Sequence, residues 1–434
     1  MLIKTQVPPC GWNSYDSYGT TLDETEAYAN LQAFVEKLKP AGYEYFVIDA
    51  GWYSKYTFAD LIKLRQEDSS QERFIDEWGR YISSPTLFPH GLRALSDACH
   101  AAGVKFGVHL MRGIPTQAVE QNTPVKGHPT AHAADIVDPV HQCMWCSYVR
   151  PINMDAPGAQ EFYNSEADYL LDELQVDFVK FDDATPYPRE VEAFAKALDR
   201  NPRPVVLSLS PGNSVTPLNW PVIEKYADLT RVTADVWDSS EFAATRFERW
   251  YIFEKCAGNG CWIDLDMLPL GRLQQNVPAD APAEMVFHGT RRETNLSRAE
   301  KETLLTQHAL AASPLIFGGA VYASSQEDLD LVTDSDMLEC NRNGIVGRQV
   351  SFQRHVDIRR ADKKGAPGHG WVGIFLREWG VKELKPESFF PADLGFDGEF
   401  PSAFFDIWNK KVLKPENGKL NVLLPPDGCV FLRF

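Results

Sequence analysis

Eight short apolar segments, each followed by a stretch of helical character, constrain most strongly how this chain of 434 residues folds. They lie at residues 11–15, 45–49, 105–110, 176–186, 204–209, 229–236, 261–267 and 314–318. Buried parallel strands are typically short apolar runs, and a helix connects each strand to the next. Eight such units predict a (β/α)8 TIM barrel, an α/β fold in which the strands close into a ring.

The pattern changes near residue 345. From there to the C-terminus, short alternating runs are joined by Gly, Pro and Asn turns, with little helical periodicity. Such a pattern is typical of antiparallel sheets. We therefore expect two domains, a (β/α)8 catalytic barrel over residues 1–344 and a C-terminal antiparallel β-sandwich domain over residues 345–434.

Local signals predict several helix ends and two long loops. Asp23 and Ser297 precede helical stretches as N-caps, Asp155 is a plausible N-cap with Pro157 in the first turn, and a short closing helix is expected over residues 328–340. The loops at residues 53–84 and 114–154 are too long for simple connectors, so we expect them to form walls of a pocket.

Charge and hydropathy exclude several classes of partner. The net charge of −17 and the pI of about 5.1 argue against nucleic acid and anionic membranes, which require basic surface. No apolar run reaches the roughly 18–20 residues of a membrane span. The N-terminal residues lack the pattern of a signal peptide, which favours a cytoplasmic protein. The expected partner is a small-molecule or oligosaccharide substrate, and the oligomeric state is not predicted.

Eight scattered cysteines favour buried thiols over a disulfide framework. One group is denser, with His141, Cys143 and Cys146 close together in the sequence. This group has the composition of a zinc or redox site, but no second Cys/His pair follows at the spacing of a zinc finger. Structural thiols are therefore the favoured interpretation, and we expect neither a metal nor a cofactor.

Polar residues cluster at the C-terminal ends of the predicted strands. They are Asp49, His109, Arg112, Lys180, Asp182, Asp183, Ser210, Arg231, Asp235, Asp264 and Asp266. In a barrel these ends converge on one cavity, so residues that are distant in the sequence become neighbours.

A cavity with many carboxylates suits two kinds of chemistry. Glycoside hydrolysis uses one carboxylate as a nucleophile and a second as a proton donor. Divalent-metal chemistry uses three carboxylates with a lysine base, and Asp182, Asp235 and Asp266 with Lys180 fit that requirement too. The spacing alone leaves both readings open, along with a catalytically silent sugar-binding protein. No dinucleotide or P-loop motif occurs.

Seven motifs narrow this choice. GWNSYDSYG, YFVIDAGW, FPHGLRALSDACHAAGVKFGVH, FVKFDD, RVTADVWDSS, CWIDLDMLPLG and ALAASPLIFGG occur in order along residues 10–344. In this order and spacing the chain resembles glycoside hydrolase family 27, the α-galactosidase and α-N-acetylgalactosaminidase family. The resemblance implies a metal-free retaining double displacement on terminal α-linked galactose or N-acetylgalactosamine.

The resemblance also implies residue roles. Asp182 corresponds to the nucleophile and Asp235 to the general acid/base, with carboxyl groups ~5–5.5 Å apart for retention. We expect Lys180 to lower the pKa of Asp182, and Val236 and Trp237 to keep Asp235 protonated by desolvation. Asp183 and Asp238 are the alternative carboxylates.

The expected substrate-binding residues surround these two acids. Lys180 corresponds to a residue that binds sugar hydroxyls, Arg231 to a pocket partner of the acid, Asp266 to the residue at the ring 2-position and Asp49 to one at the 4- or 6-hydroxyl. The full expected set is Trp12, Tyr15, Asp49, Trp52, His109, Arg112, Lys180, Ser210, Arg231 and Asp266.

Some positions depart from the family pattern. Ala50 replaces a second acid, His109 replaces an aromatic residue, and Tyr15 replaces a tryptophan. These changes leave another specificity open, for an α-glucan or a β-L-arabinopyranoside. Ser210, where α-galactosidases tend to carry a bulky acid, resembles the smaller residue that admits a 2-acetamido group.

Overall fold

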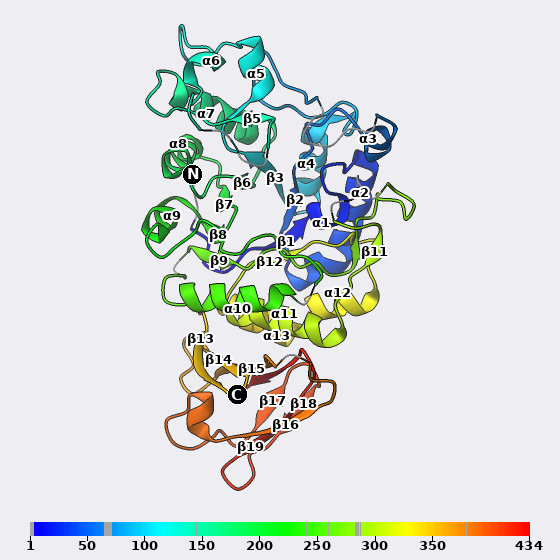
Figure 1. Cartoon of the computed structure of the whole chain (residues 1–434), viewed down its shortest axis with the longest axis vertical. Helices are drawn as coiled ribbons and strands as arrows, with labels where there is room; N and C mark the ends of the chain where they lie inside the picture. The colour runs from blue at the N-terminus through cyan, green and yellow to red at the C-terminus, as the bar shows by residue number, and fades with distance from the viewer. Residues whose placement is uncertain are drawn as a thin grey trace.

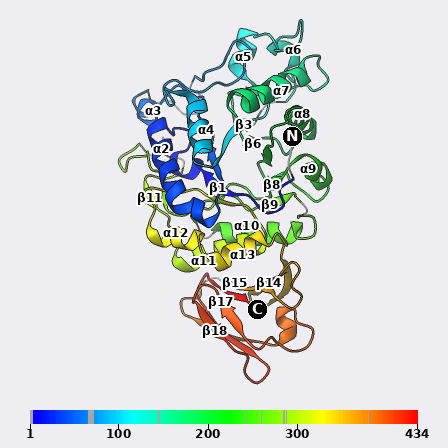
Figure 2. The same cartoon turned by 180° about the vertical axis from the view of Figure 1, so that it is seen from behind.

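The computed structural model describes residues 4–64, 72–141, 143, 146–239, 241–258, 260–282, 286, 288–378 and 380–434. Its upper part, in the view of Figure 1, is a ring of parallel strands surrounded by helices, and its lower part is a smaller antiparallel β-domain. The view from behind shows the same two parts (Figure 2). The predicted (β/α)8 barrel with a C-terminal β-domain is confirmed.

Eight parallel strands form the barrel sheet in the order β12-β1-β2-β3-β6-β7-β8-β9. Their bounds are β1 Cys10–Asn13, β2 Tyr45–Ile48, β3 Lys105–Met111, β6 Phe178–Asp182, β7 Val206–Leu209, β8 Leu229–Arg231, β9 Trp262–Asp264 and β12 Leu315–Phe317. The ring closes just after β9, where the Leu268 amide donates to the Ile316 carbonyl and the Gly318 amide donates to the Leu268 carbonyl. Each predicted strand therefore has a counterpart in the sheet.

Helices surround the ring or lie in the loops that connect its strands. They are α1 Tyr15–Tyr18, α2 Glu24–Ala33, α3 Phe58–Leu64, α4 Gly91–Ala101, α5 Thr116–Gln121, α6 Ala133–Ile136, α7 Ala159–Asp168, α8 Pro188–Asp199, α9 Trp220–Tyr226, α10 Glu241–Phe253, α11 Arg298–Leu310, α12 Gln326–Val332 and α13 Ser335–Arg342. Two short antiparallel strand pairs lie in the connecting loops. They are β4 Ile114–Pro115 with β5 Val149–Arg150, and β10 Arg272–Leu273 with β11 Arg292–Glu293. No helix in the described part of the chain is both long and apolar enough to cross a membrane.

Two helix starts follow the sequence signals. The Asp23 carboxylate accepts the Glu26 amide at the start of α2, and Ser297 forms a capping box with Glu300 at the start of α11. The predicted loops also contain structure of their own, with α3 in the first, and β4, α5, α6 and β5 in the second.

Two helix predictions are wrong. The helix expected to start at Asp155 starts at Ala159, because Gly158 takes a left-handed φ of 97° and the Asp155 carboxylate pairs with Arg189. The single helix expected over residues 328–340 is two helices. Asp334 separates them, since its carboxylate accepts the Asp336 and Met337 amides and starts α13.

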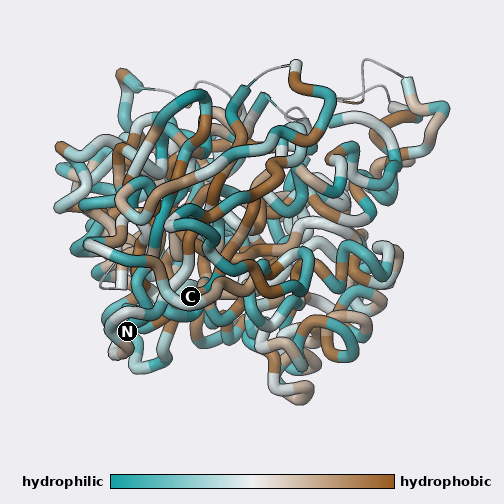
Figure 3. The backbone as a smooth tube through the Cα atoms, turned by 90° about the horizontal axis from the view of Figure 1, so that it is seen from below, coloured by the Kyte–Doolittle hydropathy of each residue, from teal (hydrophilic) through white to brown (hydrophobic). Residues whose placement is uncertain are grey.

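The C-terminal domain is a six-stranded antiparallel sheet, with the β16-β19 pair beside it. The strands are β13 Arg348–Gln353, β14 Val356–Asp362, β15 Gly370–Leu376, β16 Lys385–Phe389, β17 Phe404–Asp406, β18 Lys411–Leu413, β19 Leu420–Leu424 and β20 Cys429–Arg433. The β-domain lies beneath α10, α11 and α13 in Figure 1. Viewed from below, hydrophobic stretches of the chain run through the middle of the molecule (Figure 3).

One buried cluster extends from the barrel into the β-domain, which also has a separate buried cluster of its own. Trp371, Phe375 and Phe431 of the β-domain belong to the same buried cluster as the barrel residues. The Trp250 indole of α10 donates to the Gly347 carbonyl over 2.8 Å, and the Trp408 indole donates to the Thr306 hydroxyl of α11 over 2.9 Å. The β-domain therefore packs on the barrel as an integral part of the molecule.

Candidate active site

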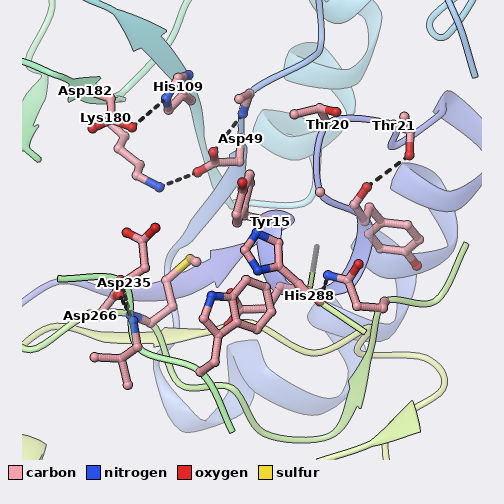
Figure 4. A pocket seen from close by; sticks show the side chains of 18 of the residues that line it. Tyr15, Thr20, Thr21, Asp49, His109, Lys180, Asp182, Asp235, Asp266 and His288 are labelled. Carbon is pink, nitrogen blue, oxygen red and sulfur yellow. Dashed lines mark hydrogen bonds and ion pairs between the residues drawn. The ribbon is translucent and has the colours of Figure 1, made fainter. Parts of the chain in front are cut away.

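A cavity of about 840 Å³ opens at the C-terminal ends of the barrel strands. Eight of the residues predicted from the sequence line it, namely Tyr15, Asp49, His109, Lys180, Asp182, Arg231, Asp235 and Asp266. They come from β3, β6, β8 and the segments that follow β1, β2, β8 and β9. Figure 4 shows their side chains converging on the same space.

Asp182, the last residue of β6, is held by three hydrogen bonds. The Ser210 hydroxyl donates to Oδ1 over 2.6 Å, the Asp183 amide donates to the same oxygen over 2.8 Å, and His109 Nε2 lies 3.3 Å from Oδ2. Burial alone would raise the pKa of Asp182. The hydrogen bond and charge of His109 and the charges of Lys180 and Arg231 outweigh it and hold that pKa well below its usual range.

Lys180, two residues before Asp182 in β6, links this strand to the segment that follows β2. Its Nζ donates to Asp49 Oδ2 over 2.8 Å, and the Asn13 amide donates to the same oxygen over 2.7 Å. Burial opposes ionisation of Asp49, but the Lys180 charge prevails and the pKa of Asp49 is lowered. The pKa of Lys180 is raised against its own burial by Asp49 and Asp182, so lysine and both carboxylates stay charged.

Arg231 pairs with two other carboxylates of the cavity, those of Asp235 and Asp266. Its Nη2 lies 2.7 Å from Asp235 Oδ1, and its Nη1 lies 3.5 Å from Asp266 Oδ1. The Asp235 side chain is 63% exposed. The desolvation expected around Asp235 from Val236 and Trp237 is therefore absent in the free protein, because the carboxylate projects into the open part of the cavity.

Asp266 organises the turn after β9. Its Oδ2 accepts the Val236 amide over 2.7 Å and its Oδ1 accepts the Met267 amide over 2.9 Å. The first of these bonds takes the chain after Arg231 out of the sheet, which is why β8 ends earlier than predicted. Asp266 has a φ of 81°, a region that non-glycine residues adopt at a cost of about 1–3 kcal/mol. Such strain is typical of functional sites.

Asp264 lies behind this turn and does not line the cavity. Its carboxylate accepts the Asp266 amide over 2.8 Å. Burial and the neighbouring Asp266 raise the pKa of Asp264 to about 7. Asp264 therefore has a structural hydrogen-bonding role behind the cavity.

Arg112 is not a cavity residue, which corrects the prediction that it binds substrate. Its side chain is 1% exposed and pairs with Asp183 over 2.9 Å and Glu190 over 2.7 Å. The guanidinium also lies 3.2 Å from the centroid of the Tyr187 ring. Because Asp183 is committed to Arg112, Asp182 is the carboxylate of this pair that faces the cavity.

Three further predicted substrate contacts are wrong. Trp12 is fully buried, stacked on Phe46, and its indole donates to the Gly319 carbonyl. Trp52 is 2% exposed and its indole donates to the His109 carbonyl over 2.8 Å, so it positions His109 from behind. Ser210 is not among the residues that line the cavity, and its hydroxyl donates to Asp182.

Among the cavity residues that sequence reasoning missed are Asp16, Trp237 and His288. Burial, reinforced by Asp266, raises the pKa of Asp16 well above its usual value. The Trp237 and His288 rings are stacked, with centroids 4.0 Å apart and an interplanar angle of 16°. Asp16 and Trp237 adjoin recognised motifs, whereas nothing in the sequence around His288 distinguished it.

The alternative acid Asp238 is occupied elsewhere. Arg292 donates to both of its oxygens, over 2.5 and 2.9 Å. Burial would raise the pKa of Asp238, but the hydrogen bonds from Arg292 and from the Asn295 amide lower it. An ionised, fully paired carboxylate is a poor proton donor, so Asp235 is the better candidate.

The described residues contain no cluster of three or more His, Cys, Asp and Glu side chains with a metal-binding arrangement. The metal-enzyme reading therefore has no ligand set in this part of the chain. Among the described residues the cysteines form no disulfide bond. Residues 142, 144 and 145 of the Cys143–Cys146 segment lie outside the described residues.

Comparisons with known proteins point to one family, although no protein-family model matches the chain. The fold matches that of a GH27 β-L-arabinopyranosidase from Geobacillus stearothermophilus, with a TM-score of 0.88. The two are 32% identical, over 99% of this chain and 97% of the other.

Similarity also extends to curated sequences. α-Galactosidase A from Cellvibrio japonicus is 22% identical over 100% of this chain and 92% of its own length. The α-N-acetylgalactosaminidase of Mus musculus is 22% identical over 82% of this chain and 74% of its own length. The likeness therefore covers both the barrel and the β-domain.

Proposed function

This chain belongs to glycoside hydrolase family 27, and from that premise we propose that it hydrolyses terminal α-linked galactose or N-acetylgalactosamine with retention of anomeric configuration. The similarity to α-galactosidases and to an α-N-acetylgalactosaminidase supports the choice of sugar. The reaction proceeds in two displacements through a covalent glycosyl-enzyme.

Asp182 is the proposed nucleophile. A nucleophile must be ionised and oriented, and both conditions are met at the end of β6. Ser210, Asp183 and His109 fix its two oxygens, while Lys180 and Arg231 favour the anion. In the first step a carboxylate oxygen of Asp182 bonds to the anomeric carbon as the bond to the leaving oxygen breaks.

Asp235 is the proposed general acid/base. In the free protein it is exposed and paired with Arg231. Asp235 gives its proton to the leaving oxygen in the first step and takes one from water in the second.

The sugar ring lies between the two acids in this proposal. Asp49 and Lys180 hold hydroxyl groups on the Asp182 side, where their mutual hydrogen bond keeps both charged. Asp266 and Arg231 face the substituent at the 2-position. No step of this scheme requires a metal or a cofactor.

The observation that carries the proposal is that Asp182 and Asp235 line one cavity. Asp182→Ala tests it, and we expect loss of aryl-glycoside hydrolysis by roughly 10⁴-fold or more. Asp182→Gly with added azide or formate should recover part of the activity, because the small anion takes the place of the carboxylate. Wild-type activity in Asp182→Ala would rule out the assignment.

A second candidate substrate is a β-L-arabinopyranoside. Ala50 lines the cavity in place of the family's second acid, so a carboxylate for the 6-hydroxyl is missing there. β-L-Arabinopyranose is α-D-galactopyranose without the 6-hydroxymethyl group, so it needs no such partner. The similar Geobacillus stearothermophilus protein is a β-L-arabinopyranosidase. The kcat/KM values for nitrophenyl α-galactoside, nitrophenyl α-N-acetylgalactosaminide and nitrophenyl β-L-arabinopyranoside decide among the three sugars.

We also propose the cytoplasm as the location. The absence of disulfide bonds among the described cysteines is consistent with a reducing compartment. Fractionation of cells that express the natural gene, followed by immunoblotting, tests this; recovery from the medium would contradict it.

A further inference from the structure

We propose that Trp237 and His288 form a platform for the ring next to the scissile bond, so that the enzyme prefers a ring-shaped leaving group, in particular a second pyranose. This inference rests on the proposed function, because it takes Asp235 as the acid that protonates the leaving oxygen.

The position of the acid determines where the leaving group lies. A general acid must come within hydrogen-bond reach of the oxygen that it protonates. The Asp235 side chain is 63% exposed, whereas Asp182 and Asp49 on the other side are 17% and 2% exposed. The glycone therefore occupies the enclosed side of the cavity, and the aglycone extends past Asp235 into its open part.

The side chains around that exit are aromatic. Trp237 follows Asp235 by two residues, and its ring stacks on His288 at 4.0 Å. The Tyr15 ring lies 5.9 Å from His288 and 6.4 Å from Trp237, and all three line the cavity. Figure 4 shows the Tyr15 and His288 rings close together in the cavity. Aromatic faces pack well against the apolar C–H faces of sugar rings.

A partly buried ion pair fixes the two rings relative to each other. Asp238, the neighbour of Trp237, is bound by Arg292 over 2.5 Å, and Arg292 Nη1 also donates to the His288 carbonyl over 2.7 Å. One guanidinium thus joins the segments that carry the two rings. A platform fixed before binding loses little entropy when the ligand arrives.

The state of His288 suits this role. Burial, with help from Arg292 and against the opposing charge of Asp235, lowers its pKa. The imidazole is therefore neutral at neutral pH, with one nitrogen that donates and one that accepts. It can stack on a sugar ring and also hydrogen-bond to its hydroxyl groups.

The cavity is large enough for two rings. Its volume of about 840 Å³ far exceeds what one pyranose fills. The structure therefore has room for a disaccharide, with one ring at the acids and the next on the platform.

A pair of substrates isolates the contribution of the second ring. Methyl α-galactoside and an α-1,6-linked galactosyl-glucose disaccharide have alkoxide leaving groups of similar basicity, but only the disaccharide carries a ring beyond the bond. If the nitrophenyl glycosides show that the enzyme prefers another sugar, the methyl glycoside and the disaccharide are made with that sugar instead. We expect wild-type kcat/KM to favour the disaccharide by tenfold or more, and Trp237→Ala to reduce that ratio at least fivefold.

Control variants distinguish failure of the platform proposal from failure of the proposed function. Tyr251→Ala removes an exposed aromatic ring outside the cavity and should leave the ratio unchanged. If Trp237→Ala fails to fold, His288→Ala provides the same test. An unchanged ratio in an active variant overturns the platform while leaving the proposed function intact. If the wild type hydrolyses neither these substrates nor any aryl glycoside of the panel, the proposed function itself fails.

Discussion

The carboxylate of Asp182 is surrounded by groups that favour its charge. His109 and Ser210 each contact a different oxygen, and Lys180 adds a cation from its own strand. Each comes from a position near a strand end, which is why the barrel topology brings them together. The same arrangement explains why the anion persists although the side chain is only 17% exposed.

Replacing His109 should change the pH dependence of activity. His109 lowers the pKa of Asp182 by its hydrogen bond and its charge. His109→Phe should therefore raise that pKa, and the acidic limb of the kcat/KM profile should move up by about one pH unit. The exposed His132 offers a control, since His132→Phe should leave the limb in place. A limb unchanged in His109→Phe would mean that another group sets it.

The loss of activity on replacing Asp235 should depend on the basicity of the leaving group. A general acid contributes about 10²–10⁴-fold, and mainly when the leaving oxygen is basic. Asp235→Ala should therefore lose this factor on a methyl glycoside and far less on a dinitrophenyl glycoside. Steady-state kinetics with both substrates measure the difference. Equal losses on the two would assign the acid role to another residue.

The sequence predicted the site best where the chemistry accepts few residue types, as for the catalytic carboxylates. The strand-end pattern placed Asp182 and Asp235 in one cavity, and the resemblance to glycoside hydrolase family 27 supplied their roles. Arg112 and Trp52 satisfied the same rule but are buried behind the cavity. Whether a side chain at a strand end points inward or outward depends on packing that the local sequence does not specify. His288 lies on a long loop, for which the strand rule makes no prediction.

At the level of elements, a buried charge network joins β3 and β6 to α8. Arg112 follows β3, Asp183 follows β6, and Glu190 lies in the first turn of α8. Asp183 adopts a left-handed φ of 55°, so the turn after the proposed nucleophile is strained. The Arg112 pairings hold this turn in place.

Removing Arg112 should therefore destabilise the protein. Arg112→Met leaves two buried carboxylates without their cation, and we expect a loss of about 3–5 kcal/mol in the free energy of unfolding. Arg189→Met, which removes an exposed pair with Asp155, should cost less than about 1 kcal/mol. Denaturant unfolding measures both. Equal stabilities would show that the buried network contributes little.

Element boundaries were predicted less well than element types. All eight barrel strands were predicted, yet β8 ends at Arg231 instead of residue 236. The reason is tertiary, because the Val236 amide bonds to the Asp266 side chain rather than to a neighbouring strand. α7 starts late for a similar reason, since Arg189 takes the carboxylate expected to cap it.

At the level of the whole molecule, one buried cluster crosses the boundary proposed at residues 344 and 345, and the β-domain has a second cluster of its own. Arg359 of β14 is 1% exposed and lies 3.0 Å from Asp357 and 3.7 Å from Glu254 of the barrel. The Phe247 and Phe375 rings are 4.9 Å apart across the same interface. An interface of buried aromatic and charged groups does not separate at low cost.

The two parts should therefore unfold together. We expect a single calorimetric transition for the full chain, with the calorimetric enthalpy equal to the van't Hoff enthalpy. A fragment of residues 1–344 should be insoluble or much less stable, because it exposes the apolar surface that the β-domain covers. Two separate transitions, or a stable active fragment, would contradict this view.

The most direct test of the central claim is to identify the residue that bonds to the sugar. A 5-fluoro-α-galactosyl fluoride, or the arabinopyranosyl analogue, slows the second displacement and lets the glycosyl-enzyme accumulate. Peptide mass spectrometry of the trapped protein should then locate the label on Asp182. A label on Asp183, Asp235 or any other residue would contradict the mechanism, as would turnover of the fluoride with inverted anomeric configuration.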